Sequence, residues 1–318
     1  MTRGAGRGER GTVFILAVLI IATLTGLTLG FSEESNIAVT LSSFSRDRFE
    51  AELLAGSGVH LTLGRLASDP DPEIDTLEEA WAEFDPPPLD GTEEVSVSGR
   101  ITDESGKFNV NTLLNEEGGI EEERAELFLR LLENLGLERD LGVPLLDWLD
   151  RDGIERMNGA ESYHYQGLDT PYRCADGPLS TIDELFLVKG MPRPKIAGGE
   201  SEATVDVRDY LTVYSDGRIN INTAPPELLQ SLSKEMDRGV AEAIASHRRT
   251  RPFQEPEALK QVPGVSEEML SGVSPWLSVT SDAFTVESRA TCRDAVSEVR
   301  AVAVRKDGNL DIIYWRVE

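Results

Sequence analysis

The stretch from Thr12 to Phe31, TVFILAVLIIATLTGLTLGF, decides where the rest of this 318-residue chain lies, because its twenty residues include no charge. As an α-helix that rises about 1.5 Å per residue, it spans roughly 30 Å, the thickness of the hydrocarbon core of a bilayer. The eleven residues before it contain three arginines and one glutamate, a net charge of +2. By the positive-inside rule, the N-terminus stays in the cytoplasm and the body is exported.

Three interpretations of this segment are open. A secretory signal peptide is the least favoured, because the apolar stretch is long and its end, residues 27–30, has no Ala-x-Ala cleavage site. A plain membrane anchor requires only the apolar stretch. A prepilin-type leader is short and basic and ends in Gly directly before the apolar run, as Arg10-Gly11 does before Thr12. This third interpretation predicts cleavage between Gly11 and Thr12, which leaves the helix on the mature protein.

Leu16 occupies the fifth position counted from Thr12, where pilin-like proteins usually carry Glu. A carboxylate inside the bilayer is costly and is retained where it meets a partner charge. A subunit with Leu at this position does not reach for the amine of a neighbour. We therefore expect either that the chain is not a pilin or that it is a subunit with no neighbour ahead of it.

The charge of the chain argues against nucleic acid as a partner. Lys and Arg total 31 against 57 Asp and Glu, a formal net charge of −26, and subtracting the +2 of residues 1–11 leaves −28 on the exported part. Such a surface repels phosphate backbones. The two cysteines, Cys174 and Cys292, lie far apart and form no CxxC pair, so we expect neither a disulfide framework nor a zinc or redox site.

Helical patterning continues beyond the membrane segment to about Leu66, because apolar residues at 44, 51, 54, 55 and 61 share one face. The Pro- and Asp-rich residues 68–72 end this helix, and Asp85-Pro86-Pro87-Pro88 breaks the chain again. We expect short strands to begin near Val95.

Residues 112–275 carry helical signals. An apolar face that includes Phe128 and Leu132 ends at Gly136, and Thr181 begins a capping box before an apolar run that stops at Gly190. Prolines 225 and 226 fit the first turn of another helix. The sequence therefore predicts an all-α block.

The C-terminus changes to a two-residue repeat, which indicates strands over residues 284–292, 296–305 and 310–317. Residues 306–309, KDGN, read as the turn of a hairpin. We expect a three-stranded antiparallel sheet with Cys292 on its apolar face as a buried free thiol.

A short motif occurs twice. Residues 108–112, FNVNT, and 219–223, ININT, share the pattern apolar-Asn-apolar-Asn-Thr, and each precedes a predicted helix. We interpret each copy as a strand-like entry whose Asn and Thr side chains cap the following helix. We favour a structural duplication over a shared ligand site, although two caps can be similar by chance.

Several longer motifs point to one family. Beside Gly11 and Leu16, they are DESGKFNVN (103–111), LDWLDRD (146–152), GAE (159–161), PYR (171–173), GPL (177–179), DEL (183–185), VKGM (188–191) and ININTAP (219–225). With these motifs in order over nearly its whole length, the chain resembles general secretion pathway protein K, the large minor pseudopilin of type II secretion. The resemblance implies an α+β fold with a long N-terminal transmembrane helix, a pilin-like antiparallel sheet and a large inserted all-α domain.

The resemblance also implies an organisation and partners. We expect a leader (1–11), the transmembrane part (12–31) and periplasmic part (32–66) of helix 1, the first part of the pilin-like domain (67–111), the inserted helical domain (112–275) and the C-terminal strands (276–318). The protein is then a single-pass protein of the Gram-negative inner membrane with a cytoplasmic N-terminus and a periplasmic body. The implied partners are the minor pseudopilins I and J, other pseudopilins and prepilin peptidase, with secreted proteins as further partners. The resemblance implies that the protein lies at the tip of the filament, where assembly begins.

The densest acidic group in the helical block has part of an EF-hand spacing. With Asp150 at position one, Asp152 and Glu161 fall at positions three and twelve of a calcium loop. Position five is Ile154, and Glu155 stands where the loop requires glycine at position six. A true EF-hand is therefore excluded.

The resemblance nevertheless implies calcium in the inserted domain, and no other cofactor is required. We take Asp147, Asp150, Asp152 and Glu161 as the candidate ligands. The alternative is that Asp147 and Asp150 are carboxylates on a helix surface and that Asp152-Gly153 simply ends the helix.

A membrane-anchored helix-hairpin-helix DNA-binding protein is the main rival function. Residues 221–224 and Val262-Pro263-Gly264-Val265 resemble such DNA-uptake receptors, but Ser266 stands in place of the second glycine and two glutamates follow. We interpret the basic cluster of residues 238 and 247–251 as a solvated helix end.

An enzyme is the third class. Only three histidines occur, and neither Gly-x-Ser-x-Gly nor His-Glu-x-x-His is present. The nucleophile-like motif Ser231-Leu232-Ser233-Lys234 lacks the companion motifs of its chemistry, so we interpret it as part of an amphipathic helix and expect no catalysis.

Overall fold

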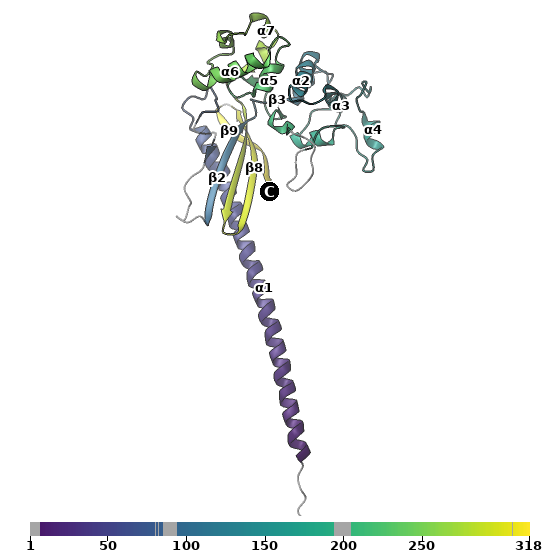
Figure 1. Cartoon of the computed structure of the whole chain (residues 1–318), viewed down its shortest axis with the longest axis vertical. Coiled ribbons are helices and arrows are strands. Elements are labelled where there is room, and N and C mark those ends of the chain that lie inside the picture. Colours follow the sequence, from purple (N-terminus) through teal and green to yellow (C-terminus); the bar gives the residue numbers. More distant parts are fainter. Residues whose placement is uncertain (1–6, 80, 82, 85–93, 194–204, 307) are drawn as a thin grey trace, which may run out of the picture.

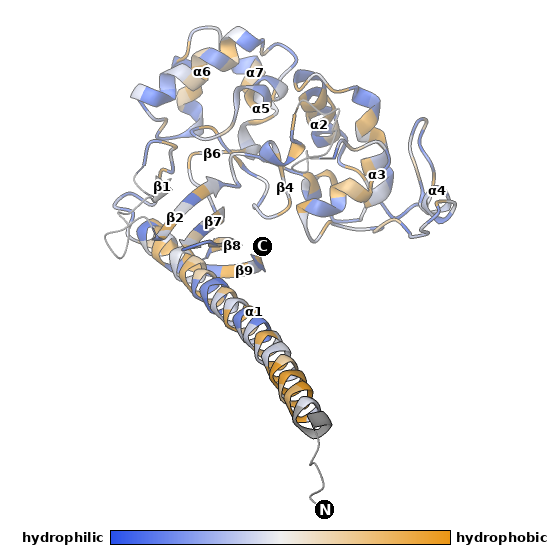
Figure 2. Ribbon diagram, turned by 60° about the horizontal axis from the view of Figure 1, so that its bottom comes forward, coloured by the Kyte–Doolittle hydropathy of each residue, from blue (hydrophilic) through white to orange (hydrophobic). Residues whose placement is uncertain are grey.

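The computed structural model describes residues 7–79, 81, 83–84, 94–193, 205–306 and 308–318. Helix α1 (Arg7–Ala67) has 61 residues and projects far out of the folded body (Figure 1). Within the described residues it is the one helix that is long and apolar enough to cross a membrane. Figure 2 shows its most hydrophobic part toward the N-terminal end. The predicted continuation to about residue 66 is confirmed, and Pro70 follows soon after the last turn.

The body contains a five-stranded antiparallel sheet with the order β1-β2-β7-β8-β9. Its strands are β1 (Glu83–Phe84), β2 (Val95–Asp103), β7 (Ala283–Cys292), β8 (Ala295–Lys306) and β9 (Asn309–Val317). The three predicted C-terminal strands and a strand beginning at Val95 are confirmed. The expected break at 85–88 and Asp307 of the expected hairpin turn lie outside the described residues.

The upper part of α1 packs on one face of this sheet. Ala55, Val59 and Leu63 are buried together with apolar residues of β2, β7 and β8 in one core. The approach is close, because a Cβ built on Gly58 would lie 2.2 Å from the Ser288 hydroxyl. Cys292 is buried as a free thiol, as predicted.

A second, larger core holds the inserted helices. The α-helices are α2 (Glu122–Asn134), α3 (Val143–Leu149), α4 (Ser162–Gln166), α5 (Pro226–Ser231), α6 (Arg238–Thr250) and α7 (Glu267–Ser271). The 3₁₀ helices are η1 (Val110–Leu113), η2 (Arg139–Gly142), η3 (Ile182–Leu187), η4 (Val207–Asp209), η5 (Pro256–Gln261) and η6 (Ser274–Trp276).

The expectation of an all-α block is wrong in one respect. Residues 112–275 include one strand of each of two short parallel pairs: β4 (Leu211–Thr212) pairs with β3 (Phe108–Asn109), and β5 (Ile219–Asn220) pairs with β6 (Leu277–Ser278). Strands β3 and β5 match the strand-like entries that the repeated motif predicts. A two-residue strand has no periodic pattern to reveal it in the sequence. The element after Thr181 is a 3₁₀ helix and not an α-helix. The predicted capping box at its start is confirmed, because the Glu184 carboxylate accepts a hydrogen bond from the backbone N–H of Thr181 at 3.1 Å.

The repeated Asn motif is a structural duplication. In each copy the first Asn accepts a hydrogen bond from the backbone N–H two residues further on, at 2.9 Å in both. The side-chain amide of Asn111 then pairs with the backbone N–H and C=O of Leu179, at 2.7 and 2.9 Å. That of Asn222 pairs in the same way with Phe253, at 2.9 and 3.0 Å.

The duplication extends beyond the motif. Leu179 and Phe253 are each followed by a 3₁₀ helix, and then by a glycine with positive φ, Gly190 at +79° and Gly264 at +95°. Each copy ends in a short strand that pairs with the strand at its start: β4 pairs with β3, and β6 pairs with β5. We call residues 108–212 the first module, residues 219–278 the second module, and both together the helical domain.

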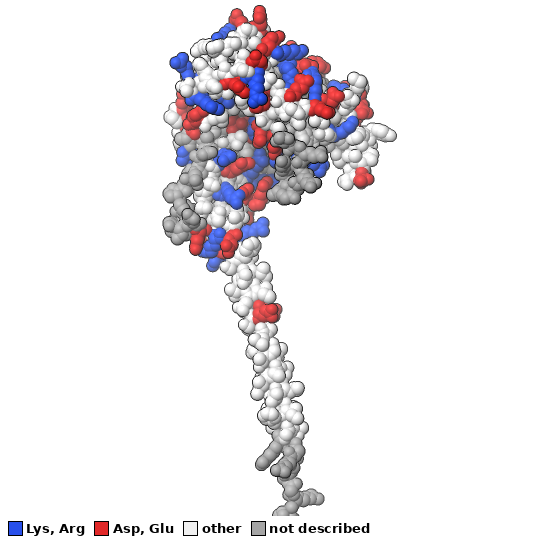
Figure 3. Space-filling view, in the orientation of Figure 1, with Lys and Arg blue, Asp and Glu red and all other residues white. Residues whose placement is uncertain are grey.

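The helical domain lies at the end of the sheet that is remote from the N-terminal end of α1 (Figure 1). On the face that Figure 3 shows, acidic and basic side chains are scattered over the body, whereas the projecting helix carries few of either. The molecule therefore has an apolar stem, a sheet and a helical cap in that order.

Candidate functional site

The structure brings together three of the four predicted calcium ligands. Helix α3 ends at Leu149, and the loop that follows folds back to the start of α4. One carboxylate oxygen from each of Asp150, Asp152 and Glu161 lies within 4.8 Å of the other two. Asp150 and Glu161 are buried, and Asp152 is exposed, so the cluster opens to solvent on one side.

Glu161 gives this cluster the character of a cation site. Its side chain is only 7% exposed, and its Oε1 atom is buried without a hydrogen-bond partner. Burial raises the pKa of Glu161, and the charges of Asp147 and Asp150 add to this effect. A divalent cation would supply the missing partner, and calcium prefers carboxylate oxygens of this kind. The residues present therefore fit calcium.

Cys174 and Asp176 also approach Glu161, with one atom of each within the same 4.8 Å limit. Burial raises the pKa of the Cys174 thiol to about 11, so the sulfur is protonated at neutral pH. A protonated thiol is a poor ligand for a hard cation. Among these neighbours, we therefore consider only Asp176 as a further oxygen donor.

Asp147 does not belong to the cluster, which corrects the sequence-based assignment. Its carboxylate accepts hydrogen bonds from the Arg156 guanidinium at 2.7 Å, from the Arg156 backbone N–H at 3.1 Å and from Ala160 N–H at 2.9 Å. Arg156 also donates to Asp150. Asp147 is close to the other acids in the sequence. In the structure, its carboxylate is bound by groups of the loop residues Arg156 and Ala160.

The alternative that Asp147 and Asp150 lie on a helix surface is wrong as well. Asp147 is 0% and Asp150 is 2% exposed. Gly159 lies so close that a Cβ there would stand 1.8 Å from Asp147 Oδ2, which explains why the Gly-Ala-Glu stretch begins with glycine. Both carboxylates thus form part of the interior of the first module.

The predicted cleavage residues Gly11 and Thr12 lie in the first turns of α1, and Leu16 is 58% exposed on the same helix. A Cβ on Gly11 would meet no atom within 4 Å. The fold therefore places no demand for glycine at this position. Cleavage between Gly11 and Thr12 stays a prediction.

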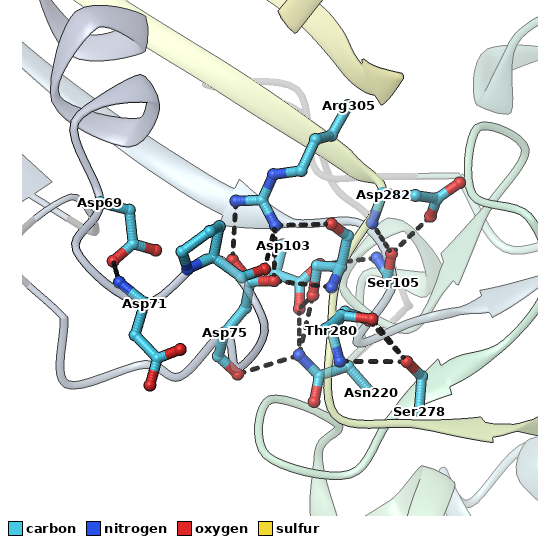
Figure 4. Close-up of polar contacts among 12 residues, drawn as sticks. Asp69, Asp71, Asp75, Asp103, Ser105, Asn220, Ser278, Thr280, Asp282 and Arg305 are labelled. Atoms are coloured by element: carbon cyan, nitrogen blue, oxygen red, sulfur yellow. Dashed lines mark hydrogen bonds and ion pairs between the residues drawn. The ribbon is translucent and has the colours of Figure 1, made fainter. Parts of the chain in front are cut away.

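Sequence reasoning missed a buried polar network where the helical domain joins the sheet (Figure 4). Its centre is Asp103, at the end of β2, which accepts hydrogen bonds from Asn220 (3.3 Å), Thr223 (2.5 Å) and Ser281 (2.6 Å). Asp75 follows α1 and forms a two-point ion pair with Arg305 of β8, at 2.8 and 2.9 Å.

The hydrogen bonds and the ion pair of this network therefore connect four segments: the chain after α1, the end of β2, the second module and β8. Asp103 is buried, and this burial raises its pKa to about 6, although the hydrogen bonds from Ser281 and Thr223 lower it. Burial also raises the pKa of Asp75, although Arg305 opposes this effect. The network fixes how the helical domain sits on the sheet.

The basic cluster and the hairpin do not form a phosphate site. Arg248 is 7% exposed and donates to the backbone carbonyls of Ile221 (2.7 Å) and Ala224 (2.6 Å), so the interpretation as a solvated helix end is wrong for this residue. Ser266 caps α7, and the first turn of that helix carries Glu267 and Glu268. These carboxylates oppose a phosphate at the place where a DNA-binding hairpin would hold it.

The nucleophile-like motif is structural. Ser231 is fully buried and its hydroxyl donates to the backbone carbonyl of Leu228 at 2.6 Å. It is therefore not presented to a substrate.

Comparison with known proteins identifies the family. Two family models, both described as protein K of the type II secretion system, match residues 106–198 and 219–280. The type II secretion system protein K of Pseudomonas aeruginosa is 32% identical over 266 residues, which cover 78% of this chain and 75% of that protein. The chain belongs to the type II secretion system protein K family. The matched ranges coincide closely with the two modules of the helical domain.

Further relatives extend the match to nearly the whole chain. The protein K of Klebsiella pneumoniae is 25% identical, with 96% of this chain and 98% of that protein covered. Among solved structures, a chain of the GspK-GspI-GspJ complex from enterotoxigenic Escherichia coli superposes with a TM-score of 0.71 at 19% identity, covering 87% of this chain and 99% of that one. The predicted α+β fold is thereby confirmed. A DNA-binding function is not favoured, since this family is a structural component of a secretion system.

Proposed function

We propose that this protein K is a minor pseudopilin that stands at the tip of the type II pseudopilus, begins its assembly and contributes to the export of folded proteins across the outer membrane. The observation that carries the proposal is the position of the helical domain, which caps the end of the sheet remote from the apolar stem. A filament that grows from the membrane adds each subunit below the last. A subunit with such a cap leaves no room for another subunit above it.

Leu16 supports the same place in the filament. A first subunit has no amine ahead of it, so a membrane carboxylate at this position would be left without a partner. The apolar side chain at Leu16 suits the membrane segment of such a subunit.

The partners and topology of the proposal follow from the same argument. The structurally similar chain was solved with GspI and GspJ, so we infer that the minor pseudopilins I and J are partners here. Prepilin peptidase removes residues 1–11, α1 anchors the protein in the inner membrane and the body lies in the periplasm. The role requires no catalysis by the protein itself.

We further propose that the first module binds calcium. Asp150, Asp152 and Glu161 would hold the ion, and Asp176 is near enough to Glu161 to contribute. Calcium, when bound, neutralises the clustered carboxylates. The unpartnered Oε1 of Glu161 supports the proposal.

Filament imaging tests the placement at the tip. Cells that make the other pseudopilins but lack this chain should form few pseudopili and should fail to secrete, and a labelled copy of the chain should appear at one end of each filament. Labels along the whole filament, or normal assembly without this chain, would exclude the tip role.

A further inference from the structure

The loop between α3 and α4 contains a chemically labile pair of residues. Of the asparagines in the sequence, only Asn158 precedes a glycine, Gly159. No side chain shields the nitrogen of a glycine that follows asparagine, so this nitrogen can attack the asparagine side chain. Asparagine is for this reason most prone to lose its amide group when glycine follows it.

The fold requires both residues of this pair. Asn158 has a φ of +69°, a left-handed conformation that asparagine adopts more readily than most residues. A Cβ at position 159 would stand 1.8 Å from Oδ2 of Asp147, a carboxylate that three hydrogen bonds hold in place, so glycine is required there. Two separate demands of the fold thus place a labile pair in a loop where Asn158 is exposed to water.

Other partners hold both reacting groups while the loop is closed. The Gly159 N–H donates to the Arg156 carbonyl at 2.8 Å, and the side-chain amide of Asn158 donates to Asp140 Oδ2 at 2.9 Å. Asp140 belongs to η2, so the second hydrogen bond ties the loop to a neighbouring element. A nitrogen whose proton is hydrogen-bonded is a poor nucleophile, and a side chain that Asp140 holds is not free to turn toward it.

Asp147 keeps the loop in this closed form. Its carboxylate accepts hydrogen bonds from the backbone N–H groups of Arg156 at 3.1 Å and Ala160 at 2.9 Å, and these two residues lie on either side of the labile pair. The loop must leave Asp147 before the Gly159 nitrogen is released from Arg156. A local opening of this kind exposes the pair without unfolding the protein.

We propose that Asn158 is a deamidation site, that opening of this loop gates the reaction, and that the modified loop does not close again. The Gly159 nitrogen bonds to Cγ of Asn158, the side-chain nitrogen leaves as ammonia with the displaced proton, and a five-membered succinimide forms. Water then opens the ring. Cleavage between Cγ and the nitrogen gives aspartate, and cleavage between the main-chain carbonyl carbon and the nitrogen gives isoaspartate. Water is the only co-reactant, and nothing is oxidised or reduced.

Neither product fits the closed loop. At position 158, a carboxylate replaces the amide donor that faces Asp140 Oδ2 at 2.9 Å, so two negative charges meet. Isoaspartate also adds a methylene group to the main chain directly before Gly159, where no space is left beside Asp147. Because Glu161 ends the same loop, deamidation also disturbs the acidic cluster.

Peptide mapping by mass spectrometry tests the site in the full-length, detergent-solubilised chain. The chain is kept at mildly alkaline pH, either folded or in urea, and samples are digested over several days. We expect Asn158 to deamidate in urea and to react at least about tenfold more slowly in the folded chain, because the rate then scales with the open fraction of the loop. Asn115 is the internal control: it is exposed but precedes Glu116, so it should change little in either state.

Asp147→Asn loosens the loop without changing the reacting pair. The amide that replaces the carboxylate forms no ion pair with Arg156, so the loop opens more often. We expect Asn158 to react at least about threefold faster in this folded variant than in the unchanged protein. Glu155→Gln, which changes an exposed acid of the same loop, is the matched control and should keep the unchanged rate.

Substitutions at position 158 test the effect of the modification on the loop. Asn158→Gly keeps the left-handed backbone and cannot deamidate, whereas Asn158→Asp copies one product. At neutral pH and low salt, where charge repulsion is least screened, we expect Asn158→Asp to melt several degrees below Asn158→Gly.

Several outcomes would overturn the proposal. Equal rates in the folded and unfolded chain would show that the loop does not gate the reaction, and an unmodified Asn158 in urea would exclude the site itself. A folded Asp147→Asn chain that reacts no faster than Glu155→Gln would contradict the role of Asp147. An Asn158→Asp chain as stable as Asn158→Gly would contradict the effect on the loop, and this comparison decides the matter if Asp147→Asn does not fold.

Discussion

The side-chain amide of Asn220 donates to the carboxylate of Asp103 at 3.3 Å, so the second module is hydrogen-bonded directly to the end of β2. The same amide also donates to the backbone carbonyl of Asp75 at 3.0 Å and to the Ser281 hydroxyl at 2.8 Å. In the first module, the equivalent Asn109 instead donates to the backbone carbonyl of Ser215, in the segment that links the two modules. In the second module, the first Asn of the motif therefore also connects the helical domain to the sheet.

The raised pKa of Asp103 predicts that the body becomes more stable in mild acid. Its pKa is about 6 in the folded protein and 3.8 ordinarily, so the folded state binds this proton more tightly. Stability from this group therefore rises as the pH falls from about 6 toward 4. One pKa unit corresponds to about 1.4 kcal/mol, so we expect a gain of about 1 to 2 kcal/mol between pH 7 and pH 5, measured by denaturant unfolding.

Asp103→Asn should flatten this pH profile, because the variant has no proton to gain. Some slope should remain, since burial also raises the pKa of Glu79, to about 7. Asp206→Asn is the control: the hydrogen bonds from Arg208 outweigh burial and lower the pKa of Asp206, so its titration lies below this window. An Asp103→Asn profile as steep as that of the unchanged protein would contradict the prediction.

The long elements were predictable from the sequence because their periodic patterns extend over many residues. Helix α1 has 61 residues and β2, β7, β8 and β9 have nine to twelve, enough for either repeat to be recognised. Strands β3 and β5 coincide with the strand-like entries predicted at the repeated motif, whereas β4 and β6, of two residues each, left no pattern.

The polar network at the junction was not predictable for a different reason. Asp75 and Ser281 bond to each other across 206 positions, and no local pattern relates them. The one local hint was Arg305, a charged residue directly after the apolar run 301–304 of β8. Likewise, the acids at 147–161 were visible in the sequence, but only the fold could show that Arg156 and the backbone N–H of Ala160 bind the Asp147 carboxylate.

Processing at the leader gives a direct prediction about the N-terminus. The mature protein should begin at Thr12 or its N-methylated form, as read by mass spectrometry of the protein from membranes. Gly11→Leu should block cleavage without changing the melting temperature of the body, because no atom lies within 4 Å of a Cβ at Gly11. Recovery of an intact Met1 in the unchanged protein, or a start beyond Phe31, would refute the prepilin interpretation.

Leu16→Glu should not improve assembly. A carboxylate inside a membrane helix is costly, up to about 2.5 to 3.5 kcal/mol at the helix centre on insertion scales, and a tip subunit offers it no partner. We therefore expect equal or lower membrane levels and equal or fewer pseudopili, counted by electron microscopy. Leu16→Met is the matched control and should behave like the unchanged protein. An increase in pseudopili with Leu16→Glu would place this chain below a neighbour and not at the tip.

Calcium should stabilise the first module. A ligand that binds only the folded state raises the free energy of unfolding by RT ln(1 + [L]/Kd), about 2.7 kcal/mol at a hundredfold excess over Kd. We expect millimolar calcium to raise the melting temperature of the detergent-solubilised chain by several degrees relative to chelator. The fluorescence of Trp148, which lies on α3 just before the acidic loop, should change with the same calcium dependence.

Variants test whether calcium binds to this cluster or to other acidic residues of the chain. Asp152→Ala and Glu161→Gln remove ligands and should abolish the calcium-dependent shift, whereas Glu155→Gln, in the same loop but outside the cluster, should keep it. Glu161→Gln should also melt at a higher temperature than the unchanged protein in chelator, because it replaces a buried carboxylate whose pKa burial already raises. Asp147→Asn should lower the melting temperature with and without calcium, since Asp147 anchors Arg156 and not the ion. A shift that survives both ligand variants, or one that Glu155→Gln removes, would locate the bound calcium elsewhere on this acidic surface.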